Sequence, residues 1–487
     1  MKKTTLTILD EVNCKFSDLD LSTRKKLVNK FKYKDHSKKY TPAVRLGRWD
    51  GSVTFFQMGG STFINLLPEI LPILEEEDYD VELDDRREYT SWYELEPVDE
   101  NSFGYAAWPE GHPDAGQPIT LRDYQIEVVN NFLKNPQALG QVATGAGKTI
   151  MTAALSQRCQ QHGRTIVIVP NKDLVRQTER DYKLLGLDVG VFFGDRKEFG
   201  KTHTICTWQS LNILLKNTRN QEAPISIQEF IEDVVCIMVD ECHQVRDSTA
   251  LKQILSSVMA QIPIRWGLTG TVPKEDFNRA TLLVSLGPVV HQLAAHHLQA
   301  QGVLADCHIN IVQMVDMVEF KDYQSELKYL LENDDRQKAM ANVIREIAKS
   351  GNTLVLIDRV APGRALADLI DGAVFLSGGT KNTDRQLEYD GFATADNKIA
   401  FATYGIAAVG INIPRIFNLV LIEPGKSFVR VIQSIGRGIR RANDKDSVDI
   451  YDITSTCKFA KRHLAKRKQF YNEAQYPNTT EKLNWKS

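Results

Sequence analysis

A glycine-rich turn between an apolar run and a helix-forming run constrains the fold of this chain more than any other feature. The turn reads Ala143-Thr144-Gly145-Ala146-Gly147-Lys148-Thr149, and the apolar run before it ends near Val142. Glycines let the backbone approach phosphate groups, and amides at the N-terminus of the following helix favour negative charge. Lys148 can reach the outer phosphates, and Thr149 offers a hydroxyl to magnesium. The pattern predicts a strand, a nucleotide phosphate loop and a helix.

This match departs from the strict pattern at one position. The pattern G-x-x-x-x-G-K-[ST] places a glycine where Val142 stands. A chance Gly-Lys-Thr turn before a helix is therefore an alternative unless a second element supports the site.

The second element is an apolar run of strand length, residues 234–239, that ends in the carboxylates of Asp240 and Glu241. A run this apolar fits a buried parallel strand. At the carboxyl end of such a strand, Asp240 would hold magnesium directly or through water. Glu241 could polarise the water that attacks the terminal phosphate. The alternative is a solvated strand end, which the upstream loop disfavours.

Charge is distributed unevenly along the chain. The 487 residues have room for roughly three domains, and 42% apolar with 25% charged residues is normal for a globular protein. The net charge of −2 does not by itself indicate a nucleic-acid partner. However, residues 1–58 carry 13 Lys and Arg against 6 Asp and Glu, whereas residues 59–117 carry 2 against 16. The first region fits a basic ligand-binding face or a solvated one, and the second fits a solvated acidic spacer.

Cysteine usage and hydropathy bear on the compartment. The seven cysteines form no C-x-x-C pair and no zinc-like cluster with histidine, so free thiols in a reducing compartment fit best. No apolar stretch reaches the ~18 residues of a membrane span, and no signal-peptide core follows Met1. We expect a cytoplasmic protein, in the host cytoplasm if a phage encodes it, with no membrane partner.

Residues 1–117 are predicted to form a small α+β accessory domain with candidate nucleic-acid contacts. Residues 22–31 favour a helix with a basic face, and the turn at residues 47–51 before a strand-like segment predicts a hairpin. Arg48 and Trp49 can contact nucleic acid through phosphate pairing and stacking. Trp49 fits equally a role in anchoring the hairpin to its own core.

Strands and helices alternate regularly over residues 118–300, after a Pro- and Gly-rich segment. This order predicts a parallel sheet wrapped on both faces, whose ligands bind at the carboxyl ends of the strands. Five candidate loops fall at such ends, at residues 143–149, 170–172, 207–210, 240–243 and 268–271. We expect them to surround one rim.

Residues 301–455 repeat the α/β pattern without a phosphate loop. They contain Gln433-Ser434-Ile435-Gly436-Arg437-Gly438-Ile439-Arg440-Arg441, a helix-forming run with arginines three residues apart. Residues 456–487 are predicted to form a basic helical extension. Its charges are Lys458, Lys461, Arg462, Lys466, Arg467 and Lys468. This basic face could meet a DNA backbone, or it could simply keep the terminus solvated.

Eight motifs, in order, resemble those of the superfamily-two helicases and translocases across about residues 118–455. They are L-R-D-Y-Q at 121–125, A-T-G-A-G-K-T at 143–149, V-P-N-K at 169–172, T-W-Q at 207–209, D-E-C-H at 240–243, L-T-G-T at 268–271, residues 402–410 and residues 433–440. That family's loop commonly reads A-x-T-G-x-G-K-T, so Val142 is no departure there. The T-G-T departs from the S-A-T of many relatives. The N-terminal turn, D-E-C-H and basic C-terminal helix resemble the phage recombination helicases of the UvsW kind.

The resemblance implies an α/β fold with two tandem RecA-like parallel-sheet domains that share an ATP site, preceded by the accessory domain. It implies that Gln125, with Arg122 nearby, reads adenine. The phosphates of ATP would be held by Thr144, Gly145, Ala146, Gly147, Lys148 and Thr149, with Gly410 added from the second domain. Gln433, Arg437 and Arg440 would face the nucleotide, where arginine stabilises the charge of the transferring phosphate. A surface helix is the alternative for the arginines.

The expected cofactors are ATP and Mg²⁺, and the expected partner is DNA, branched or forked, with R-loop RNA also considered. Backbone contacts are expected at Arg48, Asn171, Lys172, Thr207, Trp208, Thr403, Lys461, Arg462, Lys466 and Arg467. UvsW-like relatives imply movement from 3′ to 5′ and action on forks, Holliday junctions, D-loops or R-loops. The alternatives are an RNA-remodelling helicase and a nucleic-acid-binding module with a degenerate motor. The complete set of Lys148, Asp240, Glu241 and Arg440 argues against degeneracy.

Overall fold

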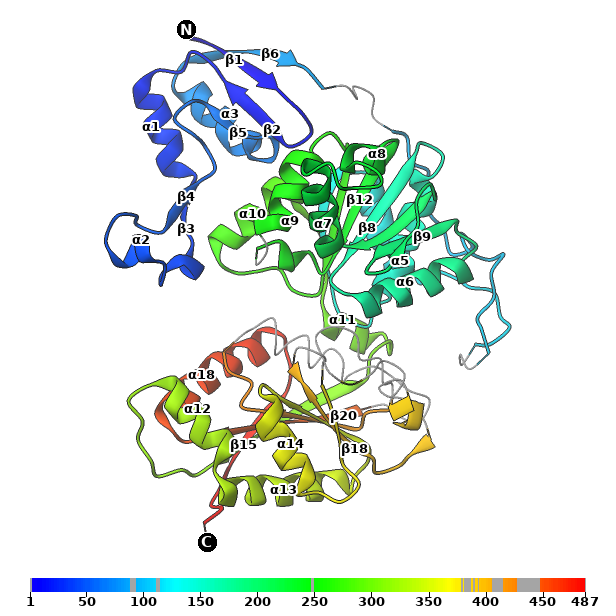
Figure 1. Ribbon diagram of the computed structural model, residues 1–487, viewed down its shortest axis with the longest axis vertical. Coiled ribbons are helices and arrows are strands. Elements are labelled where there is room, and N and C mark those ends of the chain that lie inside the picture. Colours follow the sequence, from blue (N-terminus) through cyan, green and yellow to red (C-terminus); the bar gives the residue numbers. More distant parts are fainter. Residues whose placement is uncertain are drawn as a thin grey trace. The chain divides into compact units, whose positions relative to one another are not determined.

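The computed structural model describes residues 2–87, 93–110, 114–246, 249–377, 380, 387–388, 390–392, 394–404, 415–426 and 447–486. The chain divides into two compact units, each built around its own large sheet (Figure 1). The first unit comprises Met1–Val142 and Gly147–Gln292, and the second comprises Ala143–Ala146 and Leu293–Ser487.

The first unit begins with a small α+β subdomain on a four-stranded sheet of order β5-β2-β1-β6. Its strands are β1 (Lys2–Ile8), β2 (Asn13–Phe16), β5 (Ser61–Phe63) and β6 (Tyr79–Asp85). Strand β1 pairs antiparallel with β2 and parallel with β6. The apolar faces of α1 (Leu21–Lys30), η2 (Ile64–Leu66) and α3 (Leu67–Glu76) bury side chains such as Leu27 and Ile70. Asp20 begins α1 by accepting the N–H of Thr23 at 2.7 Å.

A two-stranded ribbon projects from this subdomain. Strand β3 (Lys32–Lys34) pairs antiparallel with β4 (Ser52–Thr54), and η1 (His36–Lys38) and α2 (Pro42–Arg45) lie between them. The predicted hairpin therefore exists, but its connection is a folded segment of residues 35–51 and not a tight turn.

The subdomain shares a hydrophobic core with the rest of the first unit. Phe55 and its neighbours pack against Phe277, Ala280 and Val284 of the sheet domain. The side chain of Gln137 also donates to the carbonyl of Glu11 at 2.6 Å. Burial of this shared core fixes the subdomain on the sheet domain.

The large sheet of the first unit has the order β10-β9-β11-β8-β12-β13-β7-β14. The strands are β7 (Gln137–Val142), β8 (Arg164–Val169), β9 (Val189–Phe193), β10 (Arg196–Lys197), β11 (His203–Thr207), β12 (Val234–Asp240), β13 (Ile264–Thr269) and β14 (Val289–Leu293). From β9 to β7 each neighbouring pair is parallel. The carboxyl ends of these strands therefore meet at one rim, as predicted from the alternating pattern.

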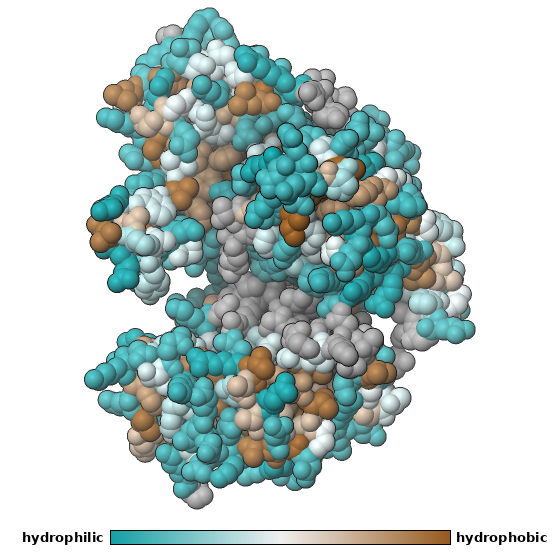
Figure 2. Space-filling view, viewed as in Figure 1, coloured by the Kyte–Doolittle hydropathy of each residue, from teal (hydrophilic) through white to brown (hydrophobic). Residues whose placement is uncertain are grey.

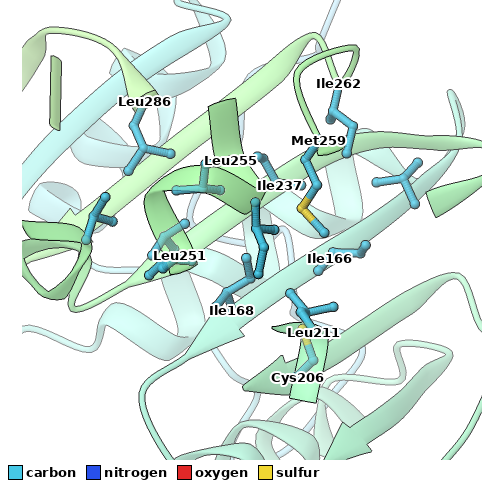
Figure 3. Packing of buried hydrophobic residues seen from close by; sticks show 14 of the residues in the cluster. Ile166, Ile168, Cys206, Leu211, Ile237, Leu251, Leu255, Met259, Ile262 and Leu286 are labelled. Carbon is cyan, nitrogen blue, oxygen red and sulfur yellow. The ribbon is translucent and has the colours of Figure 1, made fainter. Parts of the chain in front are cut away.

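Helices cover both faces of this sheet, which explains why β11 and β13 are buried along their whole length. The helices are α4 (Asp123–Leu133), α5 (Lys148–Cys159), α6 (Lys172–Leu184), α7 (Trp208–Arg219), α8 (Ile227–Ile231), η3 (Cys242–Arg246), α9 (Thr249–Gln253), the π-helical turn η4 (Ile254–Val258) and α10 (Asp276–Leu286). On one face Ile166, Ile168 and Ile237 pack against Leu211 and Leu255 (Figure 3).

The second unit contains a seven-stranded parallel sheet of order β17-β18-β16-β19-β20-β15-β21. Its strands are β15 (Asp306–Met314), β16 (Thr353–Ile357), β17 (Val374–Leu376), β18 (Ile399–Thr403), β19 (Asn418–Ile422), β20 (Ser447–Ser455) and β21 (Asn478–Leu483). Its helices include α11 (Ala295–Ala300), α12 (Tyr323–Glu332), α13 (Asp334–Ala348), α14 (Val360–Asp368) and α18 (Lys458–Glu473).

The segment predicted as a separate C-terminal extension completes the second sheet. Strand β21 pairs with β15 along the sheet edge. Helix α18 follows β20 directly, and the buried carboxylate of Glu326 accepts the N–H groups of Phe459 at 3.0 Å and Ala460 at 2.6 Å. A carboxylate at a helix N-terminus satisfies amides that have no partner within the helix. Helix α18 is thus held at its first turn by α12.

The predicted fold class, a mixed α/β protein with RecA-like parallel sheets, is confirmed. The apolar run predicted to form a buried strand, residues 234–239, lies in β12. Among the helices within the described ranges, none combines the length and apolar character that crossing a membrane requires.

Candidate functional site

The phosphate-loop motif lies between β7 and α5, where the sequence placed it. Gly145 and Gly147 have φ of 91° and 85°, in the left-handed region that glycine tolerates best. A Cβ on Gly147 would also lie 2.6 Å from Nε2 of Gln125. Any larger residue at position 147 would therefore strain the turn and displace Gln125.

Gln125 has a structural role beside the adenine-reading role expected of it. It is 6% exposed, and its Oε1 accepts the backbone N–H of Arg122 at 2.9 Å, which caps α4. Arg122 in turn donates to the hydroxyl of Tyr124 at 3.3 Å. The motif thus brings Gln125 against Gly147 and holds Arg122 beside the start of α4.

Lys148 and Glu241 form an ion pair at the rim. Nζ of Lys148, the first residue of α5, donates to Oε1 of Glu241 at 3.0 Å. Both side chains are largely buried, with 11% and 5% exposure, so the pair is poorly screened by water. The two residues are 93 positions apart, and the parallel order of β7 and β12 in the sheet brings them together.

The backbone of Glu241 is in the left-handed region, with φ of 50°. Non-glycine residues adopt this conformation infrequently, and such strain concentrates at functional sites. Asp240, the last residue of β12, accepts the N–H of Glu241 on Oδ1 at 2.9 Å. This local bond stabilises the turn that aims Glu241 at Lys148.

Asp240 and Thr149 fit the expected magnesium site by the chemistry of their donors. They offer a carboxylate and a hydroxyl, the hard oxygen ligands that Mg²⁺ prefers. Among the described residues no group of three or more His, Cys, Asp or Glu is arranged as a metal centre. Mg²⁺ is commonly held by one or two protein groups together with substrate phosphates and water.

A series of polar contacts, which sequence reasoning missed, connects Glu241 to the next strand. Nδ1 of His243 lies 2.9 Å from the hydroxyl of Thr269 and 3.4 Å from Oε2 of Glu241. The Thr269 hydroxyl also lies 3.0 Å from the carbonyl of Thr271, to which it can donate. The adjacency of D-E-C-H and L-T-G-T on neighbouring parallel strands was the signal that could have predicted this link.

The nucleic-acid residues expected on the first unit differ in accessibility. Lys172 is exposed at the start of α6, and Trp208 is half-buried at the start of α7. Asn171 caps α6 by accepting the N–H groups of Asp173 and Leu174 at 2.9 and 3.1 Å.

Thr207 is a correction to the predicted contacts. Its side chain is 5% exposed, and its hydroxyl lies 2.9 Å from that of Ser210 as the cap of α7. The sequence showed a hydroxyl at the end of a strand, but burial and capping leave it unable to face a nucleic-acid backbone. Thr207 therefore positions its loop and does not contact the strand directly.

On the second unit, Thr403 ends β18 and is half-buried. Lys461, Arg462 and Lys466 are exposed on α18, as the basic-face prediction requires. Gly410, Gln433, Arg437 and Arg440 lie outside the described residues, so their expected roles remain predictions.

Arg467 is a second correction. Its side chain is fully buried, and its guanidinium donates to both oxygens of Asp452 at 2.7 and 2.9 Å. It also donates to the carbonyl of Gly425 at 2.7 Å, while Tyr471 donates to Asp452 at 2.7 Å. A bidentate arginine in this setting is a structural element that joins α18 to the sheet. It is not available to DNA.

The chain is similar in sequence to several helicases. Residues 118–274 match the family described as Type III restriction enzyme, res subunit. The ATP-dependent DNA helicase UvsW of Enterobacteria phage T4 is 23% identical over 468 residues, covering 90% of this chain and 88% of UvsW. The DNA 3'-5' helicase XPB of Kineococcus radiotolerans is 25% identical over 370 residues, or 73% of this chain. The match covers 63% of XPB, so this chain spans less than two thirds of that relative.

Among solved structures, S. cerevisiae Dbp5 bound to RNA and ADP BeF3 aligns with a TM-score of 0.54 at 15% identity. The alignment covers 74% of this chain and 90% of Dbp5, and it shows a shared fold. The ordered motifs and the sequence matches together confirm the predicted resemblance. The chain is an ATP-hydrolysing enzyme that resembles the superfamily-two helicases and translocases, and its sequence is similar to the phage helicase UvsW.

Proposed function

We propose that this enzyme is a DNA helicase or translocase that remodels branched DNA in recombination, repair or replication restart. Forks, Holliday junctions, D-loops and R-loops are the proposed substrates, and 3′ to 5′ is the proposed direction. The names of two relatives support DNA as the track, and that of XPB supports the direction. The observation that carries the proposal is the buried contact between Lys148 and a strained Glu241 at the rim.

The ammonium group of Lys148 donates to Oε1 of Glu241. The phosphates of ATP carry more negative charge than one carboxylate, and they compete with Glu241 for the ammonium group. With Lys148 on the phosphates, Oε1 of Glu241 would accept a proton from the attacking water. The contact therefore links arrival of the nucleotide to release of the base.

Other residues position this base and the nucleotide. His243 and Thr269 hold the second oxygen of Glu241 near the loop of the neighbouring strand. Asp240 and Thr149 would hold Mg²⁺, which neutralises charge on the phosphates when bound. Gln433, Arg437 and Arg440 are proposed to stabilise the charge of the transferring phosphate.

The proposed track is the nucleic-acid backbone. The groups available for such contacts are the cations of Lys172 and of the exposed Lys and Arg side chains of α18, and the hydroxyl of Thr403. These groups suit phosphates rather than the edges of nucleobases. Binding of this type is independent of base sequence. The free thiols of all seven cysteines fit the proposed cytoplasmic location.

The test compares ATP hydrolysis stimulated by forked DNA, linear duplex, single-stranded DNA and single-stranded RNA of equal length, with Lys148→Ala as the inactive control. The proposal expects forked DNA to stimulate most. Stimulation by RNA above every DNA would instead support the RNA-remodelling alternative. Binding without hydrolysis would support a degenerate motor.

A further inference from the structure

The ribbon that projects from the N-terminal subdomain carries an unusual surface. We call residues 32–54 the basic arm. It contains six Lys or Arg against two Asp. Lys32 pairs with Asp50 at 2.6 Å, and Asp35 is buried and accepts the N–H of Ser37 at 2.9 Å. The remaining cations are Lys34, Lys38, Lys39, Arg45 and Arg48, and in the described part of the chain none has a carboxylate within ion-pair distance.

Two large apolar side chains stand among these cations. Tyr40 is 79% exposed and Leu46 is 65% exposed. Nζ of Lys39 lies 5.9 Å from the centre of the Tyr40 ring. Figure 2 shows hydrophobic atoms at the projecting arm, bordered by hydrophilic ones. A single exposed leucine is ordinary on a protein surface. An exposed tyrosine and an exposed leucine among several cations without ion-pair partners are a more specific combination.

The interior of the arm is shaped by its own backbone. Gly47 and Gly51 have φ of 66° and 77°, and the indole N–H of Trp49 donates to the carbonyl of Ser52 at 2.9 Å. Trp49 therefore anchors the arm, which was one of the two roles that the sequence left open. Tyr40 and Leu46 take no part in this anchoring. Their exposure shows that both side chains face the solvent.

The base of the arm is fixed to the ATP-hydrolysing unit. Phe55, directly after β4, lies 6.0 Å from the ring of Phe277, in the first turn of α10. Nζ of Lys252, on α9, lies 4.7 Å from the Phe55 ring and 5.7 Å from the Phe277 ring. Helix α10 follows the L-T-G-T motif and α9 follows D-E-C-H. The arm is thus attached near the two motifs that surround Glu241.

Nucleic acid matches this surface better than a protein does. Phosphates complement five cations without nearby carboxylates, and stacked or unpaired bases offer apolar faces to an aromatic ring. Apolar side chains that enter a base step also unstack it. An acidic protein partner would complement the charge, but it would supply no reason for an exposed aromatic tip.

We propose that the basic arm contacts the junction of branched DNA, with Tyr40 stacking on an unpaired base and Leu46 contacting the adjacent base step. Lys38, Lys39, Arg45 and Arg48 bind the flanking phosphates. This inference rests on the proposed function, because it requires a nucleic-acid track. Translocation along a single strand does not need the arm, whereas engagement of a junction does.

The test uses the full chain and a DNA fork with 2-aminopurine at the first unpaired position. Binding of the wild type should change the fluorescence of that base. Tyr40→Ala/Leu46→Ala should lose the change and bind the fork roughly tenfold more weakly. ATP hydrolysis stimulated by linear single strands should remain at the wild-type level. Tyr40→Phe should restore the signal, because stacking needs only the ring.

Matched variants separate this role from a general surface effect. Leu83 is 67% exposed on the acidic strand β6, so Leu83→Ala should bind the fork like the wild type. Changing Lys38, Lys39, Arg45 and Arg48 to Gln should reduce the slope of log affinity against log salt for forks, by up to about 4.

Unchanged fork affinity and fluorescence in Tyr40→Ala/Leu46→Ala would overturn the inference and leave a protein partner as the occupant. Equal loss on forks and on linear strands would also overturn it. Failure of the proposed function is a different result, because the wild type itself would then show no stimulation by any nucleic acid.

Discussion

At the scale of single residues, Glu241 combines a left-handed backbone, burial and contact with Lys148. Strain of this kind costs about 1–3 kcal/mol and persists only where the surroundings impose it. The surroundings here are the Asp240 bond to the Glu241 N–H and the His243 contact with the Glu241 carboxylate. We infer that the turn after β12 keeps this conformation because it aims the carboxylate at the phosphate loop.

Gly147→Ala should weaken ATP binding while leaving the fold intact. The substitution adds a methyl group 2.6 Å from Nε2 of Gln125 and places alanine at a φ of 85°. A cost of about 1–2 kcal/mol predicts a roughly tenfold higher KM for ATP. Gly200→Ala is the matched control, since φ is 75° there and nothing lies within 4 Å of the added Cβ. Equal effects of the two variants on KM would contradict the role of Gly147.

Arg440→Ala should lose turnover but keep most of its affinity for ATP, because arginine acts on charge that develops in the transition state. Steady-state hydrolysis together with equilibrium binding of a fluorescent ATP analogue measures both quantities. A proportional loss of affinity, with an unchanged rate for bound ATP, would remove Arg440 from this role.

At the scale of elements, α18 serves two purposes on two faces. Its buried face joins the sheet through Arg467 and Asp452, and its first turn is capped by Glu326. Its outer face presents Lys461, Arg462 and Lys466 to solvent. Substitutions on the buried face of α18 should therefore affect stability, and substitutions on its outer face should affect nucleic-acid binding.

Changing Lys461, Arg462 and Lys466 to Gln should weaken binding to all DNA sequences alike and lower the salt slope by about 2–3. Thermal unfolding should hardly change, because these side chains are exposed. Arg467→Met is the contrasting variant, since it leaves Asp452 buried without its cation and should cost about 3–5 kcal/mol of stability. Fork titrations across a salt series and thermal melts distinguish the two effects. An unaltered slope in the triple variant would leave the outer face as a solvated surface.

His203, in strand β11, should make the free energy of unfolding depend on pH. Burial lowers the pKa of His203 to about 4, from an ordinary value of 6.5. Below pH 6.5, His203 binds a proton in the unfolded chain, whereas in the folded chain it stays neutral down to about pH 4. The stability present above pH 6.5 is therefore lost as the pH falls, by about 2 kcal/mol between pH 7 and pH 5.

Urea unfolding at pH 7 and pH 5 measures this loss. His203→Gln should show a smaller difference between the two pH values than the wild type. His36→Gln, at an exposed position of the same unit, should retain the wild-type difference. A His203→Gln protein with the full acid sensitivity would assign the effect to other groups.

At the scale of the whole molecule, the sequence predicted the features that depend on local pattern. Strand β12 is a continuous apolar run from Val234 to Val239, and such runs are typical of buried parallel strands. Strand β21 escaped prediction because Asn-Thr-Thr-Glu-Lys-Leu has little β-strand pattern, and its conformation depends on pairing with β15. Its position at a sheet edge exposes one side to solvent and permits these polar residues.

The candidate site shows the same division. Motif order predicted that Lys148 and Glu241 lie close together, because parallel strands place their carboxyl ends at one rim. The burial of Arg467 was not predictable, because its partner Asp452 lies on another element. Helical spacing alone placed Arg467 among the exposed Lys and Arg side chains of α18. The link from His243 to Thr269 likewise depends on neighbouring strands in the folded sheet.

The central claim is that Lys148 binds the phosphates and Glu241 activates water. Single-turnover hydrolysis of radiolabelled ATP, with saturating DNA and with ATP binding measured in parallel, tests it most directly. Lys148→Ala should lose both ATP affinity and turnover, whereas Glu241→Gln should bind ATP and hydrolyse it at least about 100-fold more slowly. Hydrolysis at a rate near that of the wild type in either folded variant would contradict the account.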